Sequence, residues 1–593
     1  PLYKLTDEYL QLDRRQYSDM SNGSYYLVTR VKTHAAFLGQ NEKDVLKKVD
    51  SILYENIPGK ILSQKTITKN GYAGYDISNR TRRGDLQRYN IFVTPYEILF
   101  FKMSGKENYV QGKEADQFFS SIQLKETVNK PVVFEPGQGG FSASFPVQPI
   151  EYQNSLSDDG MDRWEYEAVD KTTGNAYFIF KKSVYNFRFL EEDSFDLALM
   201  EESFRNPDYF DEQESRIQSS FKGYPCLDVK EKMKDGSMLQ AKFIIKGPHY
   251  YIVAAKSRDK ATDHSSFFNS FAFTPYKYDL SSAYIDTFMH FSVSSAVVPL
   301  MNEDLRQQVE KVANDIVNGN NYPGYISYWP KTKNGLFKSD STGEMVAVSI
   351  QEYPKYYYVK DSAKFWIDEI DESYKESDLF LYRSEPLLLN HGVKGYKFVL
   401  RDTGSSRTIT RMVMLKDNYT FSLVTMGDTL TTGSAFINSF FKSFRPAEKK
   451  LGRNIYESRL DDFFTDLFSK DSTIQARAQQ SVSNIYYGEK GVPKIIDAIN
   501  RLNHSDKEYF NTKSKLIAEL GYIKDTTRPV VVNHLKKIYE QTADTSLFQN
   551  EVFHSLARHK TVAAYNLFKE LILQDPPIFE SDYEYSDLFD NLQ

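Results

Sequence analysis

Apolar and polar residues alternate, and then follow a helical period, three times along the first 447 residues. Each copy begins with a hairpin pattern, in which a polar turn containing a glycine precedes an alternating apolar strand; these glycines are Gly23, Gly174 and Gly343. A segment with apolar residues at i, i+3 and i+4 follows, at residues 41–53, 194–204 and 361–374. The pattern predicts three domains that each combine strands with a helix.

The second half of each copy is as regular as the first. A second hairpin starts at a further glycine, two strands follow, and a closing helix carries a Phe-Phe-x-Ser pattern; the glycines are Gly71, Gly223 and Gly392, and the closing patterns are residues 118–122, 267–271 and 440–444. The two glycines of a copy are 48, 49 and 49 residues apart. We expect one fold used three times, with the second glycine at a positive φ or at a close backbone approach.

A short strand precedes the second and third copies, at residues 140–146 (GFSASFP) and 288–299. The first copy lacks it: either its first strands are missing, or residues 1–16 replace them. The order of this strand, hairpin, helix, glycine-initiated strand pair and closing FFxSF helix resembles the PsbP-like α/β sandwich. The resemblance implies antiparallel sheets with helices on their faces, in binding or assembly modules that bacteria commonly export. It transfers no functional residue to this chain.

After residue 453 the helical period takes over. We expect seven helices, near residues 454–469, 472–487, 491–502, 506–521, 526–541, 545–558 and 560–574. The segments 516–540 and 552–572 are similar to HEAT-type repeats, with Leu520 and Leu556 36 residues apart. The last segment, 576–589, is acidic and aromatic, and no terminal capping helix is evident in it.

The predicted fold class is therefore α+β: three repeated antiparallel-sheet α/β sandwiches and an all-α HEAT-like solenoid. The expected domains are residues 1–128, 129–280, 281–450 and 451–593. The first of them would be truncated at its N-terminal side if its first strands are missing rather than replaced by residues 1–16. The chain begins at Pro1 and reads as a trimmed or processed piece.

Composition argues against several classes of protein and site. A net charge of −6 over 593 residues, without a basic stripe, argues against a nucleic-acid binder. The apolar runs are too short to span a membrane, which leaves peripheral association open. The single cysteine, Cys226, excludes an intrachain disulfide and a cysteine metal cluster. It aligns with Gly74 and Gly395, so we expect a small buried residue rather than a catalytic thiol.

One arginine-rich hairpin is the first candidate site. Residues 79–88 contain four arginines, which could contact an anion or a protein partner: Arg80, Arg82, Arg83 and Arg88. The alternative is the polar face of an antiparallel sheet, where charged side chains are ordinary.

A second candidate is the carboxylate turn formed by Asp158, Asp159 and Asp162, since hard cations prefer oxygen ligands. The turn lacks EF-hand spacing and the distal Glu, so a solvated turn is the alternative. His554 and His559 are five residues apart and do not share a helical face, which argues against a metal pair.

No sequence motif names a reaction. The chain has no HExxH, GxSxG, Walker or GxGxxG motif, so we predict no catalytic residue and no cofactor. Three consecutive tyrosines at 356–358 follow Pro354 in a loop; they could form a contact surface or simply pack.

The pattern favours a non-enzymatic scaffold that binds other proteins through its helical domain, in a bacterial cell envelope assembly. The envelope location, periplasmic or lipoprotein-anchored, follows from the resemblance alone, and a cytoplasmic adaptor is the alternative. Two other functions stay open: a small-ligand or ion-binding extracytoplasmic protein, which would need a pocket, and a hydrolase with dispersed catalytic residues, which only the fold could assemble.

Overall fold

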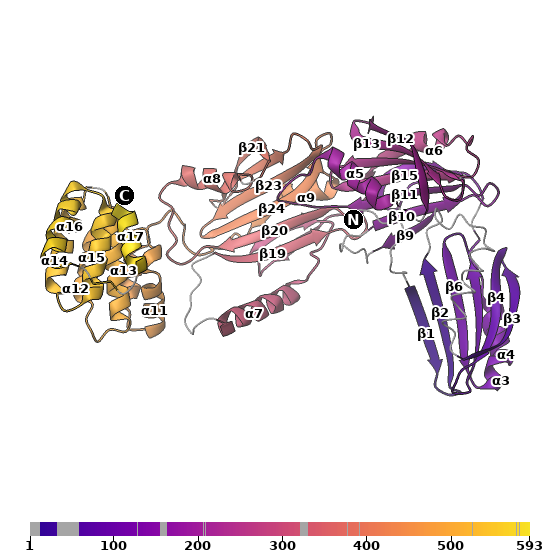
Figure 1. The fold of residues 1–593 in the computed structure, drawn as a ribbon, viewed down its shortest axis with the longest axis horizontal. Helices are drawn as coiled ribbons and strands as arrows, with labels where there is room; N and C mark the ends of the chain where they lie inside the picture. The colour runs from indigo at the N-terminus through magenta and orange to yellow at the C-terminus, as the bar shows by residue number, and fades with distance from the viewer. Residues whose placement is uncertain are drawn as a thin grey trace.

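The computed structural model describes residues 12–32, 59–126, 129–154, 163–320 except 206 and 208, and 330–592 except 376, 391, 525, 577, 580 and 581. The fold is α+β, as expected: antiparallel sheets fill the N-terminal two-thirds and helices fill the C-terminal region (Figure 1). The first sheet stands at an angle to the second, and the helical region lies beyond the third.

Three large sheets share one strand order, and every neighbouring pair is antiparallel. The first sheet runs β1-β2-β6-β5-β4-β3 and contains β1 (Leu12–Asp19), β2 (Ser24–Lys32), β3 (Lys60–Lys69), β4 (Tyr72–Arg80), β5 (Leu86–Val93) and β6 (Glu97–Gly105). The third repeats it with β19 (Lys331–Lys338), β20 (Met345–Glu352), β21 (Phe380–Leu388), β22 (Lys394–Arg401), β23 (Arg407–Lys416) and β24 (Tyr419–Asp428). A hairpin is thus followed by a four-stranded meander that returns beside its second strand.

The second sheet has the same order plus one edge strand, β9 (Ile150–Asn154). Its other strands are β10 (Arg163–Val169), β11 (Ala176–Ser183), β12 (Phe210–Phe221), β13 (Tyr224–Met233), β14 (Met238–Lys246) and β15 (His249–Ser257). We use "second sandwich" and "third sandwich" for the second and third sheets with the helices on their faces. Each of these two sheets has an apolar cluster on both faces.

The expected turn glycines have positive φ. Gly71, Gly223 and Gly392 lie at +78°, +91° and +73°. Gly71 and Gly223 follow Asn70 and Lys222, which also have positive φ, in the two-residue turns that suit a hairpin. The sequence analysis expected too few strands in this part of each copy, however. Each glycine lies inside the meander, after an edge strand that the sequence analysis did not count: β3, β12 or β21.

A helix follows the first hairpin of each sandwich whose crossover is described: α5 (Asp193–Phe204) in the second and α8 (Ser362–Asp371) in the third. The helix expected at 41–53 lies outside the described residues. The closing helices are α4 (Lys113–Ser121), preceded by α3 (Glu107–Val110), α6 (Ser265–Ser270) and α9 (Ala435–Ser443). The crossover and closing helices cover opposite faces of a sheet, since they belong to different apolar clusters.

Small sheets explain the serine of the closing pattern. The expected strands at 140–146 and 288–299 form β8 (Gly139–Phe145), with β7 (Val132–Phe134) and β16 (Ala272–Tyr276), and β18 (Phe291–Ser295), with β17 (Ser282–Asp286) and β25 (Arg445–Pro446). Ser144 N donates to Ser270 Oγ at 2.8 Å, and Ser294 N donates to Ser443 Oγ at 2.9 Å. The pattern therefore joins a closing helix to a strand that pairs with the segment after it. An extra helix, α7 (Glu303–Asn320), separates β18 from β19.

The helical region contains all seven expected helices. They are α10 (Leu460–Leu467), α11 (Ser472–Gln480) with the short η1 (Val482–Asn484), α12 (Gly488–Arg501), α13 (Tyr509–Tyr522), α14 (Arg528–Gln541), α15 (Ser546–His559) and α16 (Val562–Gln574). The last segment, in which no terminal capping helix is evident from the sequence, also contains a helix: α17 (Asp582–Leu592) packs on α15. None of the described helices has the length and apolarity to cross a bilayer.

Gly521 explains how two of these helices stack. A Cβ built on Gly521 of α13 would lie 2.8 Å from Cα of Ser555 of α15. Ser555 Oγ also donates to Ile517 O at 2.9 Å. Leu520 and Leu556, the pair from which the repeat was inferred, are fully buried beside this contact. A glycine here allows the backbones to approach, so the Leu-Gly step is a packing requirement.

Candidate functional site

Arg88 of the arginine-rich hairpin is neutralised within the first sheet. Its Nε and Nη2 donate to the two Asp76 oxygens at 3.1 and 2.8 Å, and Nη1 lies 3.4 Å from Asp116. The hydrogen bonds to Asp76 raise the pKa of Arg88. A guanidinium held by a bidentate carboxylate has little capacity left for an external anion.

The other three arginines lie at the β4–β5 turn. Arg80 donates to Gly84 O at 3.2 Å and lies 3.6 Å from Glu107. Arg82 and Arg83 are exposed in the turn and form no ion pair with a described residue. The structure therefore separates the predicted group: Arg88 belongs to a sheet-surface ion pair, and only the turn arginines face solvent.

The predicted carboxylate turn, Asp158, Asp159 and Asp162, lies outside the described residues. Within the part of the chain that the structure describes, no three His, Cys, Asp or Glu side chains are placed to hold a metal ion. His554 and His559 both lie on α15, and His554 Nδ1 is 3.3 Å from Asp587 of α17.

Cys226 occupies the position expected of it. It is buried on β13 opposite Ile244, as Gly74 lies opposite Phe92 and Gly395 opposite Met414. Burial raises the pKa of the thiol to about 11. A thiol that stays protonated at neutral pH is a poor nucleophile, which agrees with a packing role.

The three consecutive tyrosines join the third sandwich to the helical region. Tyr356 donates to Asp466 Oδ2 at 2.5 Å, and its ring meets Phe463 edge to face. Tyr357 stacks on Tyr353 with 4.3 Å between ring centroids. Tyr358 contacts Tyr486, with 5.6 Å between centroids. The run therefore makes an internal contact rather than an open surface.

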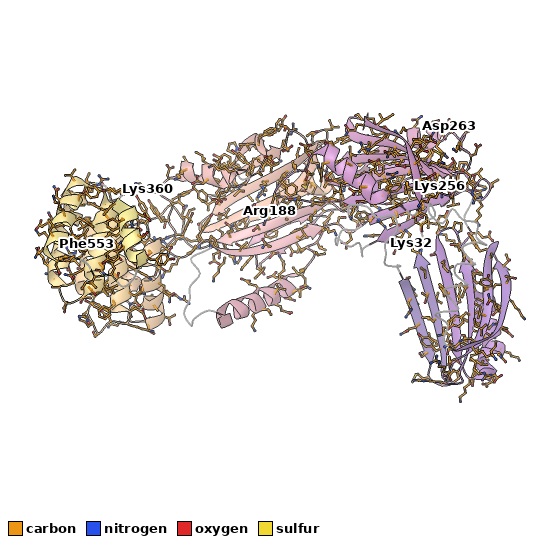
Figure 2. All side chains as sticks on the ribbon, viewed as in Figure 1. Lys32, Arg188, Lys256, Asp263, Lys360 and Phe553 are labelled. Atoms are coloured by element: carbon orange, nitrogen blue, oxygen red, sulfur yellow. The ribbon has the colours of Figure 1, made fainter. Side chains whose placement is uncertain are left out.

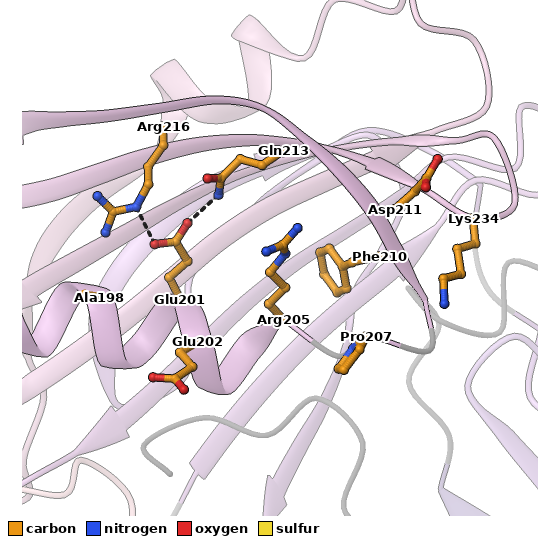
Figure 3. A pocket seen from close by; sticks show the side chains of 10 residues that line it. All are labelled: Ala198, Glu201, Glu202, Arg205, Pro207, Phe210, Asp211, Gln213, Arg216 and Lys234. Carbon is orange, nitrogen blue, oxygen red and sulfur yellow. Dashed lines mark hydrogen bonds and ion pairs between the residues drawn. The ribbon is translucent and has the colours of Figure 1, made fainter.

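One pocket of about 570 Å³ opens between the C-terminal end of α5 and the edge strand β12 (Figure 3). Glu201 accepts hydrogen bonds from Gln213 Nε2 and Arg216 Nε, both at 2.6 Å. Arg205 lies 3.5 Å from Glu231, to which Gln213 also donates at 2.8 Å. The buried Glu201 of this pocket and Glu231 beside it are thus already bound to the arginines and the amide of the lining, which leaves little chemistry for a ligand.

A second pocket, of about 550 Å³, lies under α8 in the third sandwich; we call it the α8 pocket. Its floor is formed by Ser349 and Gln351 of β20, Arg411 and Val413 of β23, and Thr420 and Ser422 of β24. Its wall comes from α8 and the turn after it, through Glu369, Glu372, Ser373, Tyr374 and Ser377. Arg188, from the second sandwich, completes it; Figure 2 shows this residue over the third sheet.

Arg411 is the unusual group of the α8 pocket. Its Nη2 donates to Phe187 O at 2.7 Å, its buried Nε has no hydrogen-bond partner, and no described carboxylate lies within 4 Å of its guanidinium. Burial lowers the pKa of this arginine. A partly desolvated cation with no counter-ion among the described residues carries a free-energy cost, so its presence calls for an explanation.

The second sandwich shows what the same positions hold in a closed core. Counted from Gly174 and Gly343, Phe180 matches Ser349, Met200 matches Glu369 and Phe204 matches Ser373. The strand register matches Ile252 with Ser422, Ala241 with Arg411 and Tyr250 with Thr420. All six residues of the second sandwich belong to its buried apolar cluster under α5. The third sandwich has polar residues at all six positions. Its helix α8 also lies farther from the strands of its sheet than α5 lies from β13 and β14.

The signal for this site was present in the sequence. The glycine turns align the copies, and a position-by-position comparison from those turns would have found polar residues at apolar strand and helix positions. The charge and motif searches missed it, because its residues come from three strands, a helix and a neighbouring domain.

A third feature is an exposed apolar surface at the C-terminal end of the helical region. Its large side chains lie on α16, on α17 and between them, and Val562, Leu573 and Tyr583 are 77%, 76% and 87% exposed. Tyr565, Ile578, Tyr585 and Phe589 are exposed nearby in the chain. We call these seven residues the α16–α17 surface. Neither a scan against protein-family models nor a search of curated proteins finds a match for this chain, so its sites are defined by geometry and by comparison among its own repeats.

Proposed function

We propose that this chain is a non-enzymatic scaffold that binds a partner protein through its helical region. The observation that carries the proposal is the α16–α17 surface, because seven large apolar side chains are exposed on two neighbouring helices and the segment between them, and exposed apolar side chains in such number typically mark a contact surface. The resemblance to exported PsbP-like modules supports a place for this scaffold in a bacterial cell envelope assembly.

Closed junctions between neighbouring domains support a scaffold. Lys32 of the first sheet is buried against Glu165 and lies 3.6 Å from Glu167 of the second. Arg407 of the third sandwich lies 2.5 Å from Asp196 of the second, with both side chains buried. Such contacts oppose free rotation about a linker, so they suit a protein that holds a binding surface in position.

The junction between the second and third sandwiches also bears on the hydrolase alternative. Ser183 Oγ and His249 Nδ1 are 2.8 Å apart, the geometry of a nucleophile and its base. Both residues are buried, neither lines either pocket, and burial lowers the pKa of His249 well below its usual value. Lys181, whose pKa burial lowers to about 7, donates nearby to Thr342 O of the third sandwich. These contacts favour domain packing over catalysis.

The test is affinity capture with a matched pair of variants. The full chain, its Leu573→Lys/Tyr583→Lys variant and a Val133→Lys/Ile217→Lys control would be used as baits in host lysate with crosslinking. The control changes two exposed apolar residues of the second sandwich. We expect one reproducible partner that the wild type and the control capture and the first variant loses. Equal capture by all three baits would contradict the proposal, as would a surface that only self-associates.

A further inference from the structure

We propose that the α8 pocket binds a small hydroxylated organic anion, of the size and class of a sugar acid or a sugar phosphate. This is a ligand site in addition to the scaffold surface, and it does not depend on the proposed partner protein. Three observations carry it: a half-buried arginine with no carboxylate partner among the described residues, two free serine hydroxyls and an amide on the floor, and the apolar residues that the second sandwich has at the same positions.

The anionic group follows from Arg411. Its guanidinium has one carbonyl partner, Phe187 O, and no carboxylate among the described residues. Arg188 lines the same pocket, is exposed, and pairs with no described carboxylate. A carboxylate or phosphate supplied from solution would provide the missing charge-assisted hydrogen bonds, which are about twice as strong as neutral ones.

The hydroxylated body follows from the rest of the lining. Ser349 and Ser422 face each other across β20 and β24, and neither hydroxyl has a hydrogen-bond partner in the described part of the chain. Gln351 adds an amide on the same floor, and Glu369, which accepts one hydrogen bond from Tyr353 at 3.0 Å, adds a carboxylate on the wall. Donors and acceptors on opposite sides suit a ligand that carries several hydroxyl groups.

Size and position agree with this class. A volume of about 550 Å³ lies within the range of ordinary small-molecule pockets and exceeds the needs of a single ion or water. The pocket lies at a junction, because Arg188 and the carbonyl of Phe187 belong to the second sandwich while the floor belongs to the third. Domain junctions are a preferred place for ligand sites.

The comparison with the second sandwich argues against a purely structural gap. The same fold closes this space with Phe180, Ile252 and four other core residues, so the open form is not imposed by the topology. Polar groups in place of a buried apolar core lower the stability of a domain. Such a departure from the packing rules is typical of a functional site. The polar groups that line the α8 pocket can serve to bind a ligand.

The experiment titrates the full chain by calorimetry with D-glucuronate, glucose 6-phosphate and, as the neutral control, D-glucose. We expect saturable binding of at least one charged probe and none of glucose. Binding of glucuronate alone would identify a carboxylate site, and binding of glucose 6-phosphate alone a phosphate site. Saturable binding of neither charged probe, or equal binding of glucose, would overturn the proposal.

Variants then locate the site. Arg411→Ala introduces the residue of the second sandwich and should weaken binding about tenfold or more, since a hydrogen bond to a charged group contributes that much. Ser422→Ile keeps the charge but fills the pocket and should also abolish binding. Arg383→Ala changes an exposed arginine on β21, and Leu573→Lys changes the α16–α17 surface; both should leave binding unchanged. Hydrogen exchange of β23 and β24 checks that each variant is folded, and a folded Arg411→Ala protein that binds as well as the wild type would overturn the assignment.

Discussion

The second and third sandwiches have the same strand order but differ in chemistry on one face. On the closing-helix face both are apolar: Phe267 and Phe271 in one and Phe440 and Phe444 in the other are almost fully buried. On the crossover-helix face the second is filled by apolar side chains under α5 and has a polar pocket only at its β12 edge, whereas the third is polar and open at the α8 pocket. The two sandwiches therefore share the chemistry of the closing-helix face and differ on the crossover-helix face within one strand order.

The third sandwich compensates for its open face with contacts from its neighbours. Its remaining cluster on that face centres on Phe365 and Trp366 of α8 and on Leu400 of β22. It also includes Leu190 from the second sandwich and Ile455 from the segment before the helical region. Apolar burial has moved from under the helix toward the two junctions, which leaves the pocket free.

Truncation on the shared face should affect both sandwiches equally and most strongly. Phe271→Ala and Phe444→Ala each remove a buried aromatic ring, which costs about 3–5 kcal/mol of unfolding free energy. Hydrogen exchange of β14 and β15, or of β23 and β24, reports the loss in each sandwich. A cost in one sandwich much smaller than in the other would show that the closing-helix faces are not equivalent.

On the crossover-helix face, exchanging the matched residues Ile252 and Ser422 should affect the stability of the two sandwiches differently. Ile252→Ser in the second sandwich removes a buried side chain and buries a hydroxyl, at a cost of about 2–5 kcal/mol. Ser422→Ile in the third places an apolar side chain in open space under α8, and we expect it to change stability by less than about 1 kcal/mol. The same local exchange experiment measures both. A large destabilisation by Ser422→Ile would mean that the polar floor is structural.

Disrupting the polar network of the α5–β12 pocket should lower stability by a smaller amount, and only in the second sandwich. Glu201→Gln removes the charge that binds Arg216 and Gln213, and should cost about 1 kcal/mol or less, because Arg216 is partly exposed. The third sandwich has Ile370 at this position. Chemical denaturation of the full chain, followed by exchange in α5, tests this. A cost of several kcal/mol would place Glu201 among the core-forming residues.

The sequence predicted most of the fold because its signals are local and repeated. Turn glycines with positive φ, the closing Phe-Phe pair and the helical period each appear in several copies that support one another. The edge strand of each meander escaped notice, since β12 is exposed along most of its length and lacks the alternation of a half-buried strand. The helix α17 escaped for a related reason: Leu588 is its one residue buried to the level of the core among those whose side chains are described.

The candidate site was harder to predict because no single segment contains it. Arg411 is half-buried on a strand that also carries Arg407, Thr408 and Lys416, so in the sequence it reads as one more charge of a polar strand face. Its lack of a carboxylate partner, and the carbonyl of Phe187 that binds it, become visible only when the second and third sandwiches are joined. For the predicted arginine hairpin the error was the reverse. Its four arginines are clustered in the sequence and suggested one site, but Arg88 is bound by Asp76 and does not act with the other three.

The smallest expected difference between the sandwiches concerns pH. Burial of Glu369 on the pocket side of α8 raises the pKa of its carboxyl, and the nearby Glu372 adds to the rise, whereas Met200 of the second sandwich does not titrate. A carboxyl whose folded pKa is raised binds its proton more tightly in the folded state. Its contribution to stability is therefore fully present below the ordinary pKa of a glutamate and is lost as pH rises through the raised value.

We thus expect exchange protection of α8 and β20 to fall between acid and neutral pH more in the wild type than in Glu369→Gln, which cannot titrate at this position. The second sandwich serves as the internal control, because α5 and β11 should show the same pH dependence in both proteins. If the wild type and the variant had identical profiles in α8, Glu369 would titrate as an exposed carboxyl does, and the wall of the pocket would be open to water rather than desolvated.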